Sequence, residues 1–109
     1  MIKEKEIKKA IERIIGAYKE DGLLSIYIFG SFAWGTPDFN SDIDIFVVVE
    51  KSDEKPYKRA VKGHRALKGV PIPADIIVFT KEEFEEQKDQ ATSFCYKIAS
   101  EGIKCYEAA

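Results

Sequence analysis

The chain has 109 residues, of which 45% are hydrophobic and 33% are charged, and its formal net charge is −2. That length suits one domain with one core, so we interpret residues 1–109 as a single domain. The composition argues against strong intrinsic binding to nucleic acid, and we expect no signal peptide and no membrane-spanning segment. Two cysteines and one histidine favour reduced thiols and a cytoplasmic location over a zinc site.

The first half of the chain predicts one helix followed by two strands. Apolar residues at helical spacing predict a helix from about Lys3 to about Asp21, with Gly22 as its C-terminal stop. The β-rich segment "LLSIYIFG" predicts the first strand and "DIDIFVVVE" predicts the second. The segment "SFAWGTPDFNS" is expected to form the loop between them.

The segment "SDEKPYKRAVKGHRALKG" predicts a second helix, because several apolar residues in it lie at helical spacing. These residues are Tyr57, Ala60, Val61 and Leu67. We therefore expect this helix to place them on one apolar face.

The remainder predicts a strand, two helices and a final edge strand. "VPIPADIIVFT" predicts the third strand, with its prolines at the entrance. Thr80 and Glu83 fit a capping box at the start of a short helix, and "TSFCYKIASEG" predicts another helix that ends at Gly102. "IKCYE" is expected to be the edge strand. This order predicts an α/β domain in which helices cover a small sheet.

Two carboxylates, Asp42 and Asp44, stand where the second strand begins. Residues two apart in a strand point to the same side, so these side chains are expected to lie together and to repel each other. Mg²⁺ relieves such repulsion, and it usually binds one or two carboxylates together with water and substrate phosphate. The pair therefore predicts a substrate that carries phosphate.

Gly30 and Ser31 end the first strand and supply groups that suit a phosphate. Glycine permits close approach of the backbone, a serine hydroxyl can donate to a phosphate oxygen, and Gly35 allows a second sharp turn. Asp75 lies near the start of the third, otherwise apolar strand. It would complete a two-metal site, unless it pairs with a lysine or caps a backbone amide instead.

The stretch "GSFAWGTPDFNSDIDIFVVV", with the later "PADIIVF", resembles the nucleotidyltransferase fold of the DNA polymerase β superfamily. It resembles more closely the minimal nucleotidyltransferases of prokaryotes, and the likeness extends over nearly the whole chain. The fold so implied is a small mixed sheet flanked by helices. The family pattern is GSxxxG…SDxD followed by an acidic residue in a later strand. The residues of this chain that match it are Gly30, Ser31, Gly35, Ser41, Asp42, Asp44 and Asp75.

The resemblance implies transfer of a nucleoside monophosphate, with AMP from ATP as the leading case, to an acceptor hydroxyl. Asp42 and Asp44 would hold two Mg²⁺ ions in the presence of the nucleotide. Asp75 would hold the metal shared with the acceptor and help to take its proton. Gly30 and Ser31 would hold the β- and γ-phosphates, and Gly35 and Ser41 would complete the nucleotide site.

The resemblance also implies a partner, because such proteins often pair with a helical HEPN protein in toxin–antitoxin systems. The transferase is then the antitoxin, and in some cases it adds AMP to the HEPN protein. One departure is Phe32, which stands where many relatives have arginine. The missing cation would then come from the basic residues that follow the second strand, namely Lys55, Lys58, Arg59, Lys62 or Arg65.

Other interpretations remain open. The domain could be a catalytically weak or inactive binding module that neutralises its partner by contact, a reading that Phe32 supports. A phosphatase-type Asp-x-Asp domain would need a nucleophilic first aspartate at the end of a strand. An EF-hand loop starting at "DFNSDID" fails at Ile43 and Val49, and Ser31 lacks a histidine partner for covalent catalysis. The acceptor, the nucleotide and any homo-oligomer are left undecided.

Overall fold

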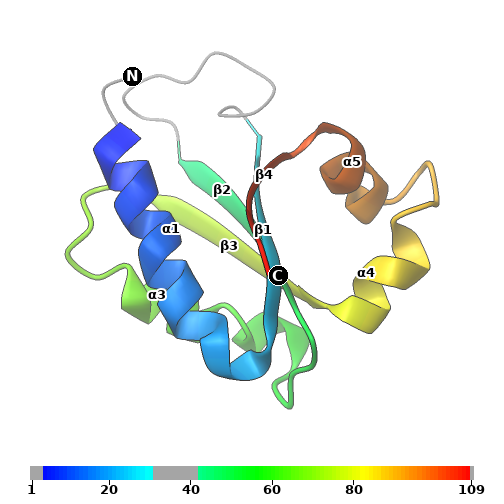
Figure 1. Cartoon of the computed structure of the whole chain (residues 1–109), viewed down its shortest axis with the longest axis horizontal. Helices are drawn as coiled ribbons and strands as arrows, with labels where there is room; N and C mark the ends of the chain where they lie inside the picture. Colours follow the sequence, from blue (N-terminus) through cyan, green and yellow to red (C-terminus); the bar gives the residue numbers. More distant parts are fainter. Residues whose placement is uncertain (1–3, 31–41, 109) are drawn as a thin grey trace.

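The computed structural model describes residues 4–30 and 42–108, and within them a four-stranded sheet carries helices on both faces (Figure 1). The elements in chain order are α1 (Glu4–Tyr18), η1 (Lys19–Asp21), β1 (Leu23–Phe29), β2 (Ile43–Val49), η2 (Pro56–Lys58), α3 (Val61–Ala66), β3 (Ala74–Thr80), α4 (Lys81–Gln87), α5 (Phe94–Glu101) and β4 (Ile103–Glu107). The predicted α/β class with a small sheet is confirmed. No helix in the described part of the chain is long and apolar enough to cross a membrane.

The sheet is mixed, and its strand order is β3-β2-β1-β4. β1 is antiparallel to both β2 and β4, whereas β2 is parallel to β3. β2 is central, and six of its seven residues are buried, which explains its nearly continuous apolar sequence. The final strand lies at the edge beside β1, as the sequence predicts.

Two apolar clusters fill the two sides of the sheet. Figure 1 shows α1 and α3 on one side and α4 and α5 on the other. The first cluster is largely aliphatic and includes Ala10, Ile14, Ile26, Ile45 and Val78. The second is largely aromatic and includes Tyr27, Phe29, Phe46, Phe84 and Ile98. Alternate residues of each strand face alternate clusters, so the strand register decides which side chains share a face.

The helix boundaries largely follow the sequence signals. The first helix continues through the 3₁₀ turn to Asp21, and Gly22 ends it with a left-handed φ of 74°. Thr80 caps α4, and the capping box with Glu83 is formed in both directions. Both predictions are confirmed, and in each case the signal is local in the chain.

The helix predicted over residues 52–69 is wrong in its extent, because the structure has only the short turn η2 and the six-residue α3. Of its expected apolar face, Leu67 is buried and Ala60 packs against the first cluster, but Tyr57 is 75% exposed and Val61 is 45% exposed. Arg59 is buried in their place, with 7% exposure. The segment is therefore held by polar contacts that apolar spacing does not reveal.

Those contacts come from Tyr18 and Glu83. The Tyr18 hydroxyl donates to the Arg59 carbonyl at 2.6 Å and accepts from the Gly63 N–H at 3.2 Å. Burial raises the pKa of Tyr18 to about 12, so the hydroxyl remains a donor at neutral pH. The Arg59 guanidinium donates to both carboxylate oxygens of Glu83, at 2.6 and 3.2 Å. Hydrogen bonds from α1 and to α4 thus fix the chain between η2 and α3.

We expect Glu83→Gln to lower the free energy of unfolding by about 1–3 kcal/mol at neutral pH, because Arg59 would lose its charged partner. Glutamine can still complete the capping box, so the change isolates the ion pair. The hydrogen bond from Arg59 holds the pKa of Glu83 below its usual range. Its contribution is therefore present above the pKa of an unfolded glutamate and is lost as the pH falls through the folded value.

Urea unfolding at several pH values measures this difference. Glu82→Gln is the matched control, since Glu82 is the exposed neighbour in the same helical turn. Equal unfolding free energies for the two variants at neutral pH would contradict the assignment.

Candidate active site

The predicted acidic residues come to one edge of the sheet. Because β1 is antiparallel to β2, the end of β1 lies beside the start of β2, and Phe29 pairs with Asp44. Because β2 is parallel to β3, the two strands start together, and Asp44 pairs with Asp75. The Ile43 N–H donates to the Pro73 carbonyl at 2.9 Å, a bond that ties the two strand starts. The convergence expected from the sequence is found for these described residues.

Asp44 and Asp75 also share one face of the sheet. Asp44 lies two positions before Phe46 of the aromatic cluster, and Asp75 lies two positions before Ile77, which packs against that cluster. Paired residues on neighbouring strands are separated by about 4.8 Å. Asp44 is partly buried, whereas Asp75 is exposed. The two carboxylates are therefore neighbours, one against the core and one open to solvent.

Asp42 lies immediately before β2 and is exposed. The pKa of Asp44 is raised, first by burial and then by the negative charges of Asp75 and Asp42. All three carboxylates are thus close enough to repel. A cation placed among them would remove both the repulsion and part of the cost of burying the charge.

The backbone of Gly30 lies close to Asp44 of this acidic group. Its φ is +76°, a left-handed value that residues other than glycine rarely adopt. A Cβ built on Gly30 would overlap Asp44 Oδ2 and would lie 3.0 Å from Asp44 Cγ. The sequence predicts close approach of Gly30 to a ligand phosphate, and the structure shows close approach to the Asp44 carboxylate. A phosphate resting on this turn would lie directly beside Asp44.

Several predicted nucleotide-binding residues lie outside the described part of the chain. These are Ser31, Gly35 and Ser41, and Phe32, which stands in place of the arginine, lies outside it too. Their roles therefore stay predictions from the sequence. The last described residue before them is Gly30, which lies against Asp44.

Two cations proposed to replace the missing arginine are occupied elsewhere. Arg59 donates to the Val78 carbonyl and to Glu83, near the end of β3 opposite Asp75. Lys62 pairs with Asp21, which precedes β1 and so lies at that same far end of the sheet. Contact with a triphosphate at the acidic edge is therefore not their role in this fold.

The donor set suits a hard cation such as Mg²⁺, since all three groups are carboxylates. Within residues 4–30 and 42–108, no three acidic, histidine or cysteine side chains are already arranged as ligands of one metal ion. Mg²⁺ commonly uses only one or two carboxylates and takes its other ligands from water and substrate phosphate. The pKa of Asp44 is raised first by burial and then by the neighbouring charges, and a bound cation would offset both effects.

Comparison with known proteins gives a family and a set of related folds. The family model described as a nucleotidyltransferase domain matches residues 5–105. No curated protein matches the chain. A candidate nucleotidyltransferase from Sulfolobus solfataricus, solved at 1.40 Å resolution, is 30% identical with a TM-score of 0.57, covering 78% of this chain and 73% of that one.

Two solved toxin–antitoxin structures share the fold at lower identity. One is an MntA-HpeT mutant in which two aspartates separated by one residue are replaced by glutamate. It is 20% identical, with a TM-score of 0.60, and covers 89% of this chain and 73% of that one. The other, solved with AMP-PNP, is 22% identical with a TM-score of 0.62 and the same coverage.

We expect Asp44→Asn to stabilise the free protein at neutral pH by roughly 0.5–2 kcal/mol. A raised carboxyl pKa means that the folded state favours the protonated form. Stability is therefore greatest below the pKa of an unfolded aspartate and falls as the pH rises through the folded value. Asparagine cannot ionise, so the variant does not lose stability as the pH rises.

Urea unfolding of wild type and Asp44→Asn between acidic and neutral pH measures this difference, and Asp53→Asn, at an exposed position, is the control. Parallel pH curves for wild type and Asp44→Asn would refute the expectation.

A double-mutant cycle tests the contact between Gly30 and Asp44. Gly30→Ala should destabilise the fold by more than about 1 kcal/mol, through both the φ of +76° and the overlap with the carboxylate. Asp44→Ala should remove only the second part, which gives a coupling energy of about 0.5–3 kcal/mol. Additive unfolding free energies would show that the two residues do not touch.

Proposed function

The chain belongs to the nucleotidyltransferase domain family, and from this premise we propose that it transfers AMP from ATP to a hydroxyl on a partner protein. The observation that carries the proposal is the register pairing of Asp44 with Asp75, with Gly30 pressed against Asp44. In the proposal the phosphate lies on the glycine side, and the acceptor approaches the exposed Asp75. Both sides meet at one partly buried carboxylate.

In this proposal Asp42 and Asp44 hold Mg²⁺ around the triphosphate, and Asp75 shares in holding the ion nearest the acceptor. When bound, the metal ions neutralise charge on the attacking and leaving oxygens of the displacement. The acceptor oxygen forms a bond to the α-phosphorus, and the bond from that phosphorus to pyrophosphate breaks. Asp75 is exposed at the edge of the sheet, so its carboxylate can take the proton of an incoming hydroxyl.

The Gly30 turn has a second role in the proposal, since it lets the backbone lie close to the phosphates. Ser31 follows directly in the sequence and would donate its hydroxyl to a phosphate oxygen, and Gly35 and Ser41 would complete the nucleotide site. The relation between Gly30 and Asp44 would then keep phosphate and metal next to each other.

The partner in this proposal is a helical HEPN-type protein, and the chain is the antitoxin of the pair in the cytoplasm. Support comes from the shared fold of the two toxin–antitoxin structures, one of which was solved with the ATP analogue AMP-PNP. The mutant structure alters two aspartates with the same spacing as Asp42 and Asp44. Asp75 is exposed, and in the proposal the hydroxyl of the partner approaches it there.

We expect α-labelled ATP with Mg²⁺ to label a co-expressed HEPN-type partner encoded beside this gene. Each of Asp42→Asn, Asp44→Asn and Asp75→Asn should reduce the rate by at least about a hundredfold, because each removes a charge from the metal site. Asp53→Asn is the control, as Asp53 is exposed in the turn after β2. Gel autoradiography measures the transfer, and circular dichroism confirms that each variant is folded.

If none of the four nucleoside triphosphates labels the partner, the enzymatic proposal is excluded. If the partner is then still neutralised by Asp42→Asn/Asp44→Asn, inhibition by contact alone is the function.

A further inference from the structure

Positive charge is concentrated in one segment of this acidic protein. Residues 55–74 contain six of the 17 basic residues and none of the 19 acidic ones. The segment therefore contributes +6, which leaves the remainder of the chain at −8. Such a separation of charge favours association with a negatively charged surface.

Two of these six cations are used within the fold. Arg59 pairs with Glu83, and Lys62 pairs with Asp21. Lys58 and Arg65 are exposed, and neither has an acidic partner among the described residues. Their charges are thus available to another molecule.

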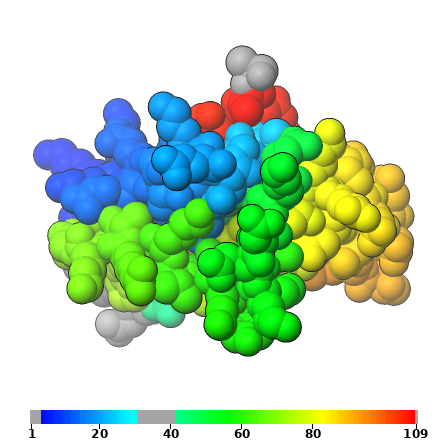
Figure 2. Space-filling model, turned by 90° about the horizontal axis from the view of Figure 1, so that it is seen from below, coloured from blue at the N-terminus to red at the C-terminus, as the bar shows by residue number. Residues whose placement is uncertain are grey.

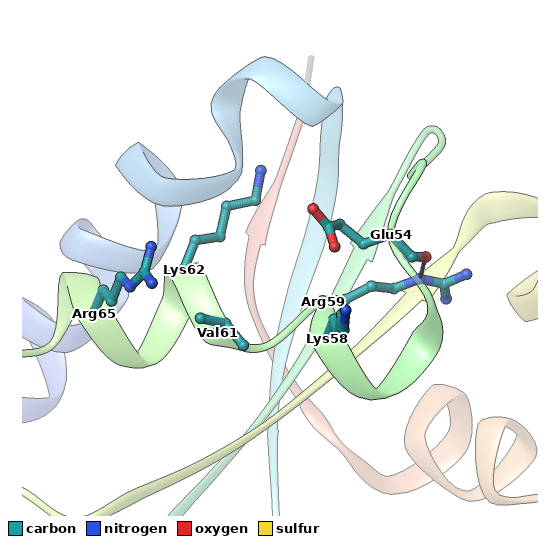
Figure 3. A pocket seen from close by; sticks show the side chains of 6 residues that line it. All are labelled: Glu54, Lys58, Arg59, Val61, Lys62 and Arg65. Atoms are coloured by element: carbon teal, nitrogen blue, oxygen red, sulfur yellow. Dashed lines mark hydrogen bonds between the residues drawn. The ribbon is translucent and has the colours of Figure 1, made fainter.

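A hollow of about 360 Å³ lies among these side chains. Its lining residues are Glu54, Lys58, Arg59, Val61, Lys62 and Arg65. Figure 3 shows Lys62 and Arg65 extending from α3, while Lys58, Arg59 and Glu54 come from η2 and the turns beside it. Figure 2 views the molecule from below, and the segment after β2 occupies the centre of that face.

Exposed apolar groups accompany the charges. Val61 lines the hollow with 45% exposure, and Tyr57 is 75% exposed. The Lys58 ammonium lies 6.0 Å from the centre of the Tyr57 ring, so Tyr57 adjoins the hollow. We call Tyr57, Lys58, Val61, Lys62 and Arg65 the basic surface. Tyrosine and arginine are enriched at the centres of protein–protein interfaces.

We infer that the basic surface binds an acidic segment of a partner protein that also presents an apolar side chain. The carboxylates of that segment would meet Lys58 and Arg65, and its apolar side chain would cover Val61 and Tyr57. A nucleic acid fits less well, because the hollow contains Glu54 and a phosphate backbone running beyond it would meet a remainder of net charge −8.

The basic surface lies away from the acidic edge. Arg59 contacts Val78 near the end of β3, whereas Asp75 lies at its start. Lys62 of the basic surface pairs with Asp21 just before β1. The seven residues of β1 span about 20 Å and end at Phe29, the partner of Asp44, so docking beside Lys62 leaves the site around Asp44 open. This inference stands independently of the proposed transferase activity.

The test uses the whole chain and a short fluorescent peptide that carries several glutamates around one leucine. We expect binding by fluorescence anisotropy at low salt, and weaker binding as salt is raised. Lys58→Glu/Arg65→Glu should weaken it by roughly tenfold or more, and Tyr57→Ala should weaken it without loss of stability. Lys8→Glu/Lys9→Glu changes the net charge equally at exposed positions on α1 and should have little effect.

No peptide binding at low salt, or equal losses in the two double variants, would overturn the inference. Tighter binding of a single-stranded RNA oligonucleotide, lost in Lys58→Glu/Arg65→Glu, would assign the surface to nucleic acid instead. A matched peptide with glutamine in place of glutamate should not bind. Thermal unfolding of each variant shows whether a loss of binding reflects a loss of fold.

Discussion

The register of β2 between β1 and β3 is the constraint on which the candidate site depends. Backbone pairing places Asp44 beside Phe29 on one neighbour and Asp75 on the other. Ile43 and Ile45 are completely buried on the opposite face of the same strand. If β2 slipped by one residue, Ile43 and Ile45 would move to the face of the aromatic cluster. The side chain of Asp44 would then point into the other, largely aliphatic cluster. The hydrophobic core thus fixes the positions of the acidic side chains.

Much of this arrangement can be predicted from the sequence because its signals are local. Strand alternation places Asp44 opposite Ile43 and Ile45, and the capping box of α4 needs only four residues. The prediction for residues 52–69 is wrong because distant residues decide that segment. Tyr18 is 41 positions from Arg59, and Glu83 is 24 positions from it. Apolar spacing carries no information about these polar partners.

The candidate site, too, could be predicted only in part from the sequence. Glycine at position 30 predicts a tight approach, but its neighbour could be identified only once β1 and β2 were paired. The repulsion felt by Asp44 likewise depends on Asp75, which lies on another strand and far along the chain. Spacing within one strand predicts the Asp42 and Asp44 pair alone. The third acid joins them because β3 is parallel to β2 and begins at the same level.

The mixed sheet gives the molecule two chemically different ends. The start of β2 and β3 is acidic, whereas cations gather beyond their far ends, where Arg59 and Lys62 are neutralised within the fold. Connections from β2 to β3 must cross from one end to the other, since parallel strands cannot be joined by a tight turn. That crossover is the basic segment itself, so the topology that aligns Asp44 with Asp75 also requires this segment to return from the far end of the sheet to the start of β3.

The burial of Asp44 has a consequence for the life of the protein in a cell. An ionised carboxylate held against an apolar cluster weakens the empty fold, whereas metal and nucleotide bound there would strengthen it by mass action. Proteases that degrade unfolded chains would then remove the empty form faster than the loaded form. Under the proposed function, the lifetime of the folded chain is therefore linked to occupancy of the same carboxylate that holds the metal.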